Sequence, residues 1–165
     1  MPIFGAMSNT VYDYKLKNIK GEPLDLSAYK GKKILLVNTA SACGLTPQYK
    51  QLEELHENFK DKLQIIGLPC NDFAGQEPGT EQEIANFCEV NFGVSFPLTS
   101  KVKIKGEHPD AIYEFLTKKE LNGYSDSQVE WNFQKYLLDE SGHLINIFAP
   151  PVDPLSDEIL KAIED

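Results

Sequence analysis

The sequence contains no arginine, and all 16 of its basic residues are lysines. Its 25 acidic residues leave a formal net charge of −9 at pH 7. Such a chain is repelled by nucleic-acid phosphates and by anionic lipid surfaces, so we expect neither as a partner. The missing arginine also removes the side chain that best binds carboxylates through two parallel hydrogen bonds.

Long apolar runs are also missing. No stretch approaches the roughly 18 apolar residues that a membrane-spanning helix needs. Residues 1–10 lack the basic start and apolar run of a signal peptide. We therefore expect a cytoplasmic protein with no stable membrane association. The length of 165 residues predicts one domain, 1–165, with residues 1–9 as a loose N-terminal extension.

Cysteine is scarce. The chain has three cysteines, an odd number that excludes a fully paired disulfide framework. No CxxC pair and no His/Cys cluster with metal spacing occurs, so we expect neither a metal nor another cofactor. In a cytoplasmic chain, the three thiols are therefore either reactive groups or inert core residues.

The distribution of apolar residues predicts an α/β fold with a central mixed sheet flanked by helices. Short apolar runs at residues 34–37 and 63–68 are typical of buried strands. Alternation over residues 11–16 predicts an early strand or N-terminal β-hairpin. A second hairpin is expected where residues 136–138 and 144–148 flank a polar, glycine-containing turn.

Helix-start signals place four helices between and after these strands. Thr46 and Pro47 are suited to the cap and first position of one helix. Thr80 and Glu83 form the capping box of another, which we expect over residues 80–91. Two more helices are predicted, over residues 109–118 and 155–163.

Cys43 lies in the predicted loop between the strand at residues 34–37 and the helix that begins near Thr46. The macrodipole and free N–H groups of a helix N-terminus favour an anion, and therefore the reactive thiolate. Cys43 is thus a candidate nucleophile. Its position alone is equally consistent with a small residue packed in a turn.

Three segments resemble the signatures of the glutathione peroxidase family: NTASACGLT at residues 38–46, LPCNDFAGQEPG at 68–79 and EWNFQKYL at 130–137. They occur in the family's order, and the resemblance covers the chain from about Thr10 to its end. It implies a thioredoxin-like fold and reduction of hydrogen peroxide and of organic or lipid hydroperoxides to water or alcohols. Cysteine stands where the selenoenzymes have selenocysteine, so no selenium is expected.

The resemblance makes Cys43 the peroxidatic residue and places Gln76, Trp131 and Asn132 at the family's other active-site positions. Neutral amide and indole N–H groups suit this chemistry, because they stabilise a thiolate and a departing oxyanion without adding a repelling charge. Lys135, in the third segment, would add local positive potential. Outside the motifs, a lone tryptophan or a loop amide is more often a core or turn residue.

Cys88 matches the resolving cysteine of relatives that form a disulfide with the peroxidatic residue and are reduced by thioredoxin. It shares a predicted helical stripe with Ile84 and Phe87, so an inert buried thiol is the alternative. To bond with Cys43 it would have to leave its helix, and we expect residues 80–91 to unwind on oxidation. Cys70, inside the second segment, is given no catalytic role.

The absence of arginine, together with Cys88, favours a thioredoxin-like reductant over glutathione, and other departures from the family bear on the thiolate and on assembly. No arginine is available for the two glutathione carboxylates, and the segment at residues 146–151 lacks the arginine that relatives usually carry before the aromatic residue. Asp72 replaces a common glutamine and would disfavour the thiolate if it lay near Cys43. The short segment 119–128 lacks the insertion of tetrameric relatives, so we expect a monomer or weak dimer.

The alternative functions are a glutathione-dependent peroxidase without a resolving cysteine, and a redox sensor or relay that passes its disulfide to a client protein.

Overall fold

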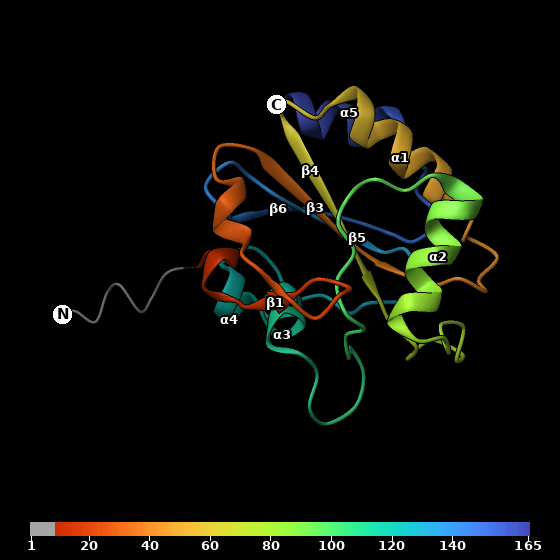
Figure 1. The fold of residues 1–165 in the computed structure, drawn as a ribbon. Coiled ribbons are helices and arrows are strands. Elements are labelled where there is room, and N and C mark those ends of the chain that lie inside the picture. The colour runs from red at the N-terminus through yellow and green to blue at the C-terminus, as the bar shows by residue number, and fades with distance from the viewer. Residues whose placement is uncertain (1–8) are drawn as a thin grey trace.

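A computed structural model describes residues 9–165 of the chain (Figure 1). The prediction of a loose extension over residues 1–9 therefore lies, except for Asn9, outside the described residues. Over the part that is described, no helix is long and apolar enough to cross a membrane.

The centre of the fold is a four-stranded mixed sheet in the order β4-β3-β5-β6. Its strands are β3 (Lys33–Thr39), β4 (Leu63–Pro69), β5 (Lys135–Leu138) and β6 (Leu144–Phe148). The two long strands, β3 and β4, run parallel, and β5 is antiparallel to both of its neighbours. The two predicted central strands and the second hairpin are thus confirmed, as is the thioredoxin-like arrangement of the sheet.

Helices cover both faces of this sheet (Figure 1). One face carries α1 (Gln48–Asn58), α2 (Glu81–Phe92) and α5 (Asp157–Glu164), whose apolar side chains share one core cluster. The other face carries α3 (Ala111–Thr117), α4 (Lys119–Asn122), the 3-10 turns η2 (Val11–Asp13) and η3 (Leu26–Tyr29), and a small hairpin of β1 (Leu16–Lys17) and β2 (Pro23–Leu24).

Alternation along the strands divides the core between these two faces. On β3, Leu35 and Val37 face the cluster beneath α1, whereas Ile34 and Leu36 face the cluster beneath α3. Successive side chains of a strand point to opposite faces, so a fully apolar strand builds two cores at once. All seven residues of β3 are buried as a result.

Two sequence predictions differ from the structure. The N-terminal β-hairpin is confirmed, but it lies further along the chain than predicted: η2 occupies the start of residues 11–16, and the hairpin of β1 and β2 begins at Leu16. The side chain of Asn18 accepts the N–H groups of Lys20 and Glu22 in its turn. Thr46 does not cap α1, which begins at Gln48. Its hydroxyl is committed to the preceding loop instead. The capping box of Thr80 and Glu83 at the start of α2 is confirmed.

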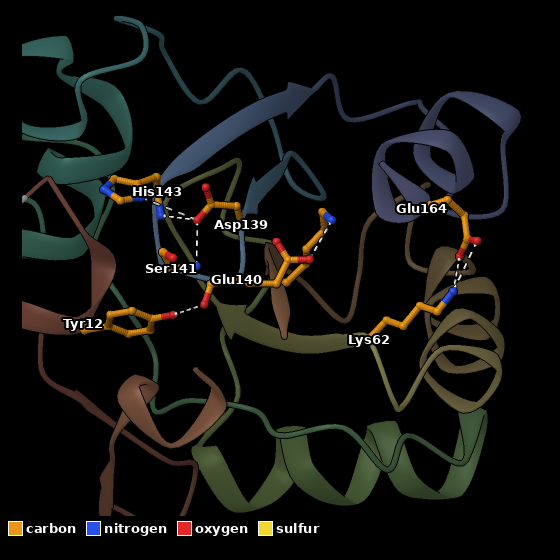
Figure 2. A network of polar contacts seen from close by, with 8 residues as sticks. Tyr12, Lys62, Asp139, Glu140, Ser141, His143 and Glu164 are labelled. Carbon is orange, nitrogen blue, oxygen red and sulfur yellow. Dashed lines mark hydrogen bonds and ion pairs between the residues drawn. The ribbon is translucent and has the colours of Figure 1, made fainter. Parts of the chain in front are cut away.

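Several polar contacts lie at the end of the sheet at which β3 begins (Figure 2). Lys33 Nζ forms an ion pair with Glu140 Oε2 at 3.0 Å, and the Tyr12 hydroxyl donates to the Glu140 carbonyl at 3.2 Å. Lys62 pairs with Glu164 at 3.0 Å and ties α5 to the start of β4. These contacts brace the end of β3 opposite to the end that leads into the Cys43 loop.

Candidate active site

Cys43 lies in the tight loop that joins β3 to α1. Its Sγ atom accepts the N–H of Leu45 at 3.3 Å, and its own N–H donates to Thr46 Oγ1 at 2.9 Å. The Thr46 hydroxyl in turn donates to the carbonyl of Ala40 at 2.7 Å, so the threonine holds the loop together. This turn directs a backbone N–H at the sulfur, an arrangement that stabilises a thiolate.

Cys43 is also the most accessible of the three cysteines. Its exposed fraction is 8 %, against 1 % for Cys88 and 0 % for Cys70. Of the three cysteines, Cys43 is therefore the one with the largest contact with solvent.

Gln76 and Asn132 come together next to this loop. Asn132 Nδ2 donates to Gln76 Oε1 at 3.0 Å, across 56 residues of sequence. The backbone carbonyl of Gln76 accepts the N–H of Ala42, the residue before Cys43, at 3.0 Å. The structure thus places two of the predicted amide side chains beside the Cys43 loop.

Trp131 lies at the edge of the same region and contacts both core clusters. Its ring packs edge-on against Phe73 with centroids 5.9 Å apart. Its carbonyl accepts Asn38 Nδ2 at 3.1 Å, which fixes the backbone from which the indole projects. Trp131 is half-buried, so part of the residue is accessible to solvent.

Asn38 organises the third motif, and this role was not predicted. Besides the Trp131 carbonyl, it bonds two further backbone groups: Phe133 N–H donates to its carbonyl at 2.6 Å and Gln134 N–H to its Oδ1 at 3.1 Å. Asn38 is fully buried at the end of the apolar strand β3. A buried polar side chain needs hydrogen-bond partners. The asparagine at the end of this apolar strand was therefore the feature of the sequence from which such contacts could have been predicted.

The positions of the other two cysteines separate their roles. Cys88 belongs to the core cluster that contains Cys43, whereas Cys70 belongs to the cluster on the opposite face of the sheet. Burial raises the pKa of Cys88 to about 11 and that of Cys70 to about 12. All three thiols are free. Cys88, and not Cys70, shares a face of the sheet with Cys43.

Asp72 is engaged by another segment of backbone. Its Oδ2 accepts the N–H groups of Ile104 and Lys105 at 2.7 and 3.0 Å. Burial by itself would raise the pKa of this carboxyl, but these hydrogen bonds outweigh it and lower the pKa. The aspartate at this motif position therefore holds the backbone of residues 104–105 in place.

Lys135 does not supply the full positive charge expected of it. The side chain is completely buried, and burial lowers its pKa to about 7, although Asp153 opposes this shift. Its Nζ donates to the Pro150 carbonyl at 2.9 Å, and Gln48 Nε2 donates to the same oxygen at 2.9 Å. The Pro150 carbonyl thus links Lys135 on β5 to Gln48, the first residue of α1, near the Cys43 loop.

Within residues 9–165, no group of three or more His, Cys, Asp or Glu side chains is arranged to hold a metal ion. The groups that the structure places at this site are the Cys43 thiol and the Gln76–Asn132 amide pair, which is bonded to the backbone of Ala42.

Comparison with known proteins identifies the family of this chain. The family model described as glutathione peroxidase matches residues 11–117. A glutathione peroxidase of Lactococcus lactis subsp. cremoris is 44 % identical over 155 residues, which cover 92 % of this chain and 98 % of that protein. The glutathione peroxidase-like peroxiredoxin 2 of Saccharomyces cerevisiae is 40 % identical over 151 residues, with 91 % and 93 % of the two chains covered.

Comparison of the fold with solved structures agrees with the comparison of sequences. The crystal structure of Trgpx in its apo form superposes with a TM-score of 0.71 at 32 % identity, covering 94 % of this chain and 96 % of that one. Since sequence and fold agree over almost the whole chain, the protein belongs to the glutathione peroxidase family and is a peroxidase.

Proposed function

We propose that this peroxidase reduces hydrogen peroxide and organic or lipid hydroperoxides through a sulfenic acid on Cys43. A disulfide between Cys43 and Cys88 then forms and is reduced by a thioredoxin-like protein. The observation that carries the first step is the Gln76–Asn132 amide pair, which is bonded to the backbone beside Cys43. Such a cycle would give the protein an antioxidant role.

The first step needs a thiolate and a stabilised leaving group. The Cys43 thiolate attacks one peroxide oxygen, the O–O bond breaks, and the other oxygen leaves with the electron pair as alkoxide or hydroxide. The Leu45 N–H at the sulfur favours the thiolate. Amide N–H groups of Gln76 and Asn132 and the Trp131 indole N–H would stabilise the departing oxyanion, because they are donors that carry no negative charge.

Substitution of Asn132 tests this assignment. We expect Asn132→Ala to slow oxidation of Cys43 by about 10²–10³-fold, since one donor to a developing oxyanion contributes about 3 kcal/mol. The rate is measured by rapid mixing with hydrogen peroxide, with the fluorescence of Trp131, the only tryptophan, as reporter. Asn86→Ala, at an exposed position on α2, is the matched control and should react like the wild type. Equal rates for both variants would remove Asn132 from the mechanism.

Resolution by Cys88 requires α2 to open locally. Cys88 is buried in this helix, and a disulfide needs Cα atoms within about 4.4–6.8 Å of each other. We propose that the thiol leaves its position in the core to bond with Cys43. We expect peroxide to increase amide hydrogen exchange across α2 in the wild type and not in Cys88→Ser. Unchanged protection of α2 in the oxidised wild type would contradict this step.

The reductant is tested by NADPH consumption with hydroperoxide, coupled either to thioredoxin and its reductase or to glutathione and its reductase. We expect turnover with thioredoxin that is lost in Cys88→Ser, because the disulfide that thioredoxin attacks can no longer form. The single oxidation of Cys43 should persist in this variant. Turnover with glutathione that survives Cys88→Ser would show instead that Cys88 is a core residue and that glutathione is the donor.

A further inference from the structure

A cavity of about 380 Å³ adjoins Trp131 and has no role in the cycle proposed above. Its volume lies within the range of about 300–1,000 Å³ that small-molecule sites occupy. Its walls combine apolar and charged side chains: Phe73, Ile104, Val129, Lys105 and Glu130. The Phe73 ring packs edge-on against Trp131 with centroids 5.9 Å apart, and Glu130 directly precedes Trp131 in the chain. The cavity is therefore next to a residue to which the cycle assigns peroxide cleavage.

The Lys105 ammonium is positioned over the aromatic wall of this cavity. Its Nζ lies 5.1 Å from the centroid of the Phe73 ring, which is within cation–π range. Asp72 Oδ2 accepts the N–H groups of Ile104 and Lys105 at 2.7 and 3.0 Å, which fixes the backbone from which the side chain extends. Among residues 9–165, no ion pair joins Lys105 to a carboxylate. Its positive charge is therefore available to a ligand.

The hydroxyl groups of the cavity wall are already engaged. Thr117 Oγ1 donates to a backbone carbonyl of its own helix at 2.6 Å, and the Ser127 hydroxyl is hydrogen-bonded to that of Tyr136 at 2.8 Å. Lys105 and Glu130 are both exposed and are the charged residues of the lining. These two side chains are therefore the groups that select a ligand by its charge.

We propose that this cavity binds the organic part of a hydroperoxide that carries a carboxylate. Lys105 binds the carboxylate, and the hydrocarbon part lies against the apolar wall. Since only the Phe73 ring separates Lys105 from Trp131, a substrate bound in this way extends its hydroperoxide toward Trp131. Glu130 lies in the same wall and repels a second negative charge, which favours a singly charged group. The inference rests on the proposed reduction of organic hydroperoxides and specifies which of them the protein prefers.

The test compares a linoleic acid hydroperoxide with its methyl ester, which has the same hydrocarbon chain and no charge. Each is mixed rapidly with excess reduced protein at concentrations below micelle formation, and Cys43 oxidation is followed by acid quenching and mass spectrometry. Because both substrates react with the same thiol, the ratio of the acid rate to the ester rate cancels any effect on Cys43 itself. We expect Lys105→Gln to lower this ratio about fivefold, the effect of one ion pair near the surface.

Glu130→Gln should change the same ratio in the opposite direction. Removal of this carboxylate removes a repulsion, so the acid-to-ester ratio should rise about two- to threefold. Lys103→Gln is the matched control, because it removes the same charge from an exposed lysine that does not line the cavity. Its ratio should equal that of the wild type.

The salt dependence of the ratio tests its electrostatic origin. The Debye length falls from about 30 Å at 0.01 M to about 8 Å at 0.15 M ionic strength. The wild-type ratio should therefore fall toward that of Lys105→Gln as sodium chloride is added. The ratio of Lys105→Gln should change much less, since it lacks the charge that is screened.

The outcomes separate this inference from the function on which it rests. If hydrogen peroxide and both organic hydroperoxides left Cys43 unoxidised, the proposed function itself would be overturned. Oxidation by all three, with the same acid-to-ester ratio in the wild type and in Lys105→Gln, would overturn only the carboxylate site, as would oxidation by hydrogen peroxide alone. An equal fall of the ratio in Lys103→Gln would also overturn it, because net charge and not the cavity would then be the cause.

Discussion

Replacement of Cys43 by serine is expected to lower peroxidase turnover by on the order of 10⁴-fold or more. Serine has nearly the same shape and can accept the same Leu45 N–H, so the fold should persist. Its hydroxyl is a far weaker nucleophile than a thiolate, and the chemical step needs that nucleophile. The measurement is steady-state consumption of hydroperoxide with excess reductant, at equal protein concentrations.

Cys70→Ala is the matched control for this experiment. Cys70 is buried on the opposite face of the sheet, and its thiol has a pKa of about 12 because of burial, so it is protonated at neutral pH. Removing it should leave turnover close to that of the wild type. If Cys70→Ala lost activity while Cys43→Ser kept it, the assignment of the peroxidatic residue would be reversed.

Phe133→Ala should have the largest effect on stability, a loss of about 3–5 kcal/mol in the free energy of unfolding. The ring is fully buried and packs edge-on against Tyr49 with centroids 5.4 Å apart. Its truncation leaves a cavity between β5 and α1. The backbone of Phe133 has a φ of 70°, which side-chain-bearing residues seldom adopt, so packing of the ring helps to hold this conformation.

The loss is measured by urea unfolding followed by circular dichroism. Phe133→Leu keeps most of the side-chain volume and should cost less than about 1.5 kcal/mol. Tyr124→Ala, at an exposed aromatic, should change stability by no more than about 0.5 kcal/mol. A loss below about 1 kcal/mol in Phe133→Ala would mean that the turn at Asn132 is held by its backbone bonds to Asn38 alone.

Local patterns in the sequence determined much of the fold. The apolar runs at residues 34–37 and 63–68 became β3 and β4, because a strand buried on both faces must be apolar throughout. The capping box of Thr80 and Glu83 set the start of α2, since it acts through groups only three residues apart. These features need no information from distant parts of the chain.

The sequence also determined the family, through three motifs and the residues within them. Cys43 was identified by its place between a strand and a helix as well as by its motif. Gln76 and Asn132 were identified by resemblance alone, since 56 residues separate them and nothing local to either shows that they are hydrogen-bonded.

Only the tertiary structure decided the remaining features, because each depends on a contact with a distant segment or on burial. Asn38 gains its role from its contacts with the motif at residues 131–134, and the burial of Glu77 follows only from the packing of its loop. Thr46 was misread as a helix cap because its hydroxyl is taken by the Ala40 carbonyl in the folded loop. Local patterns establish which segments form strands and helices, whereas the partners of buried polar groups are chosen by packing.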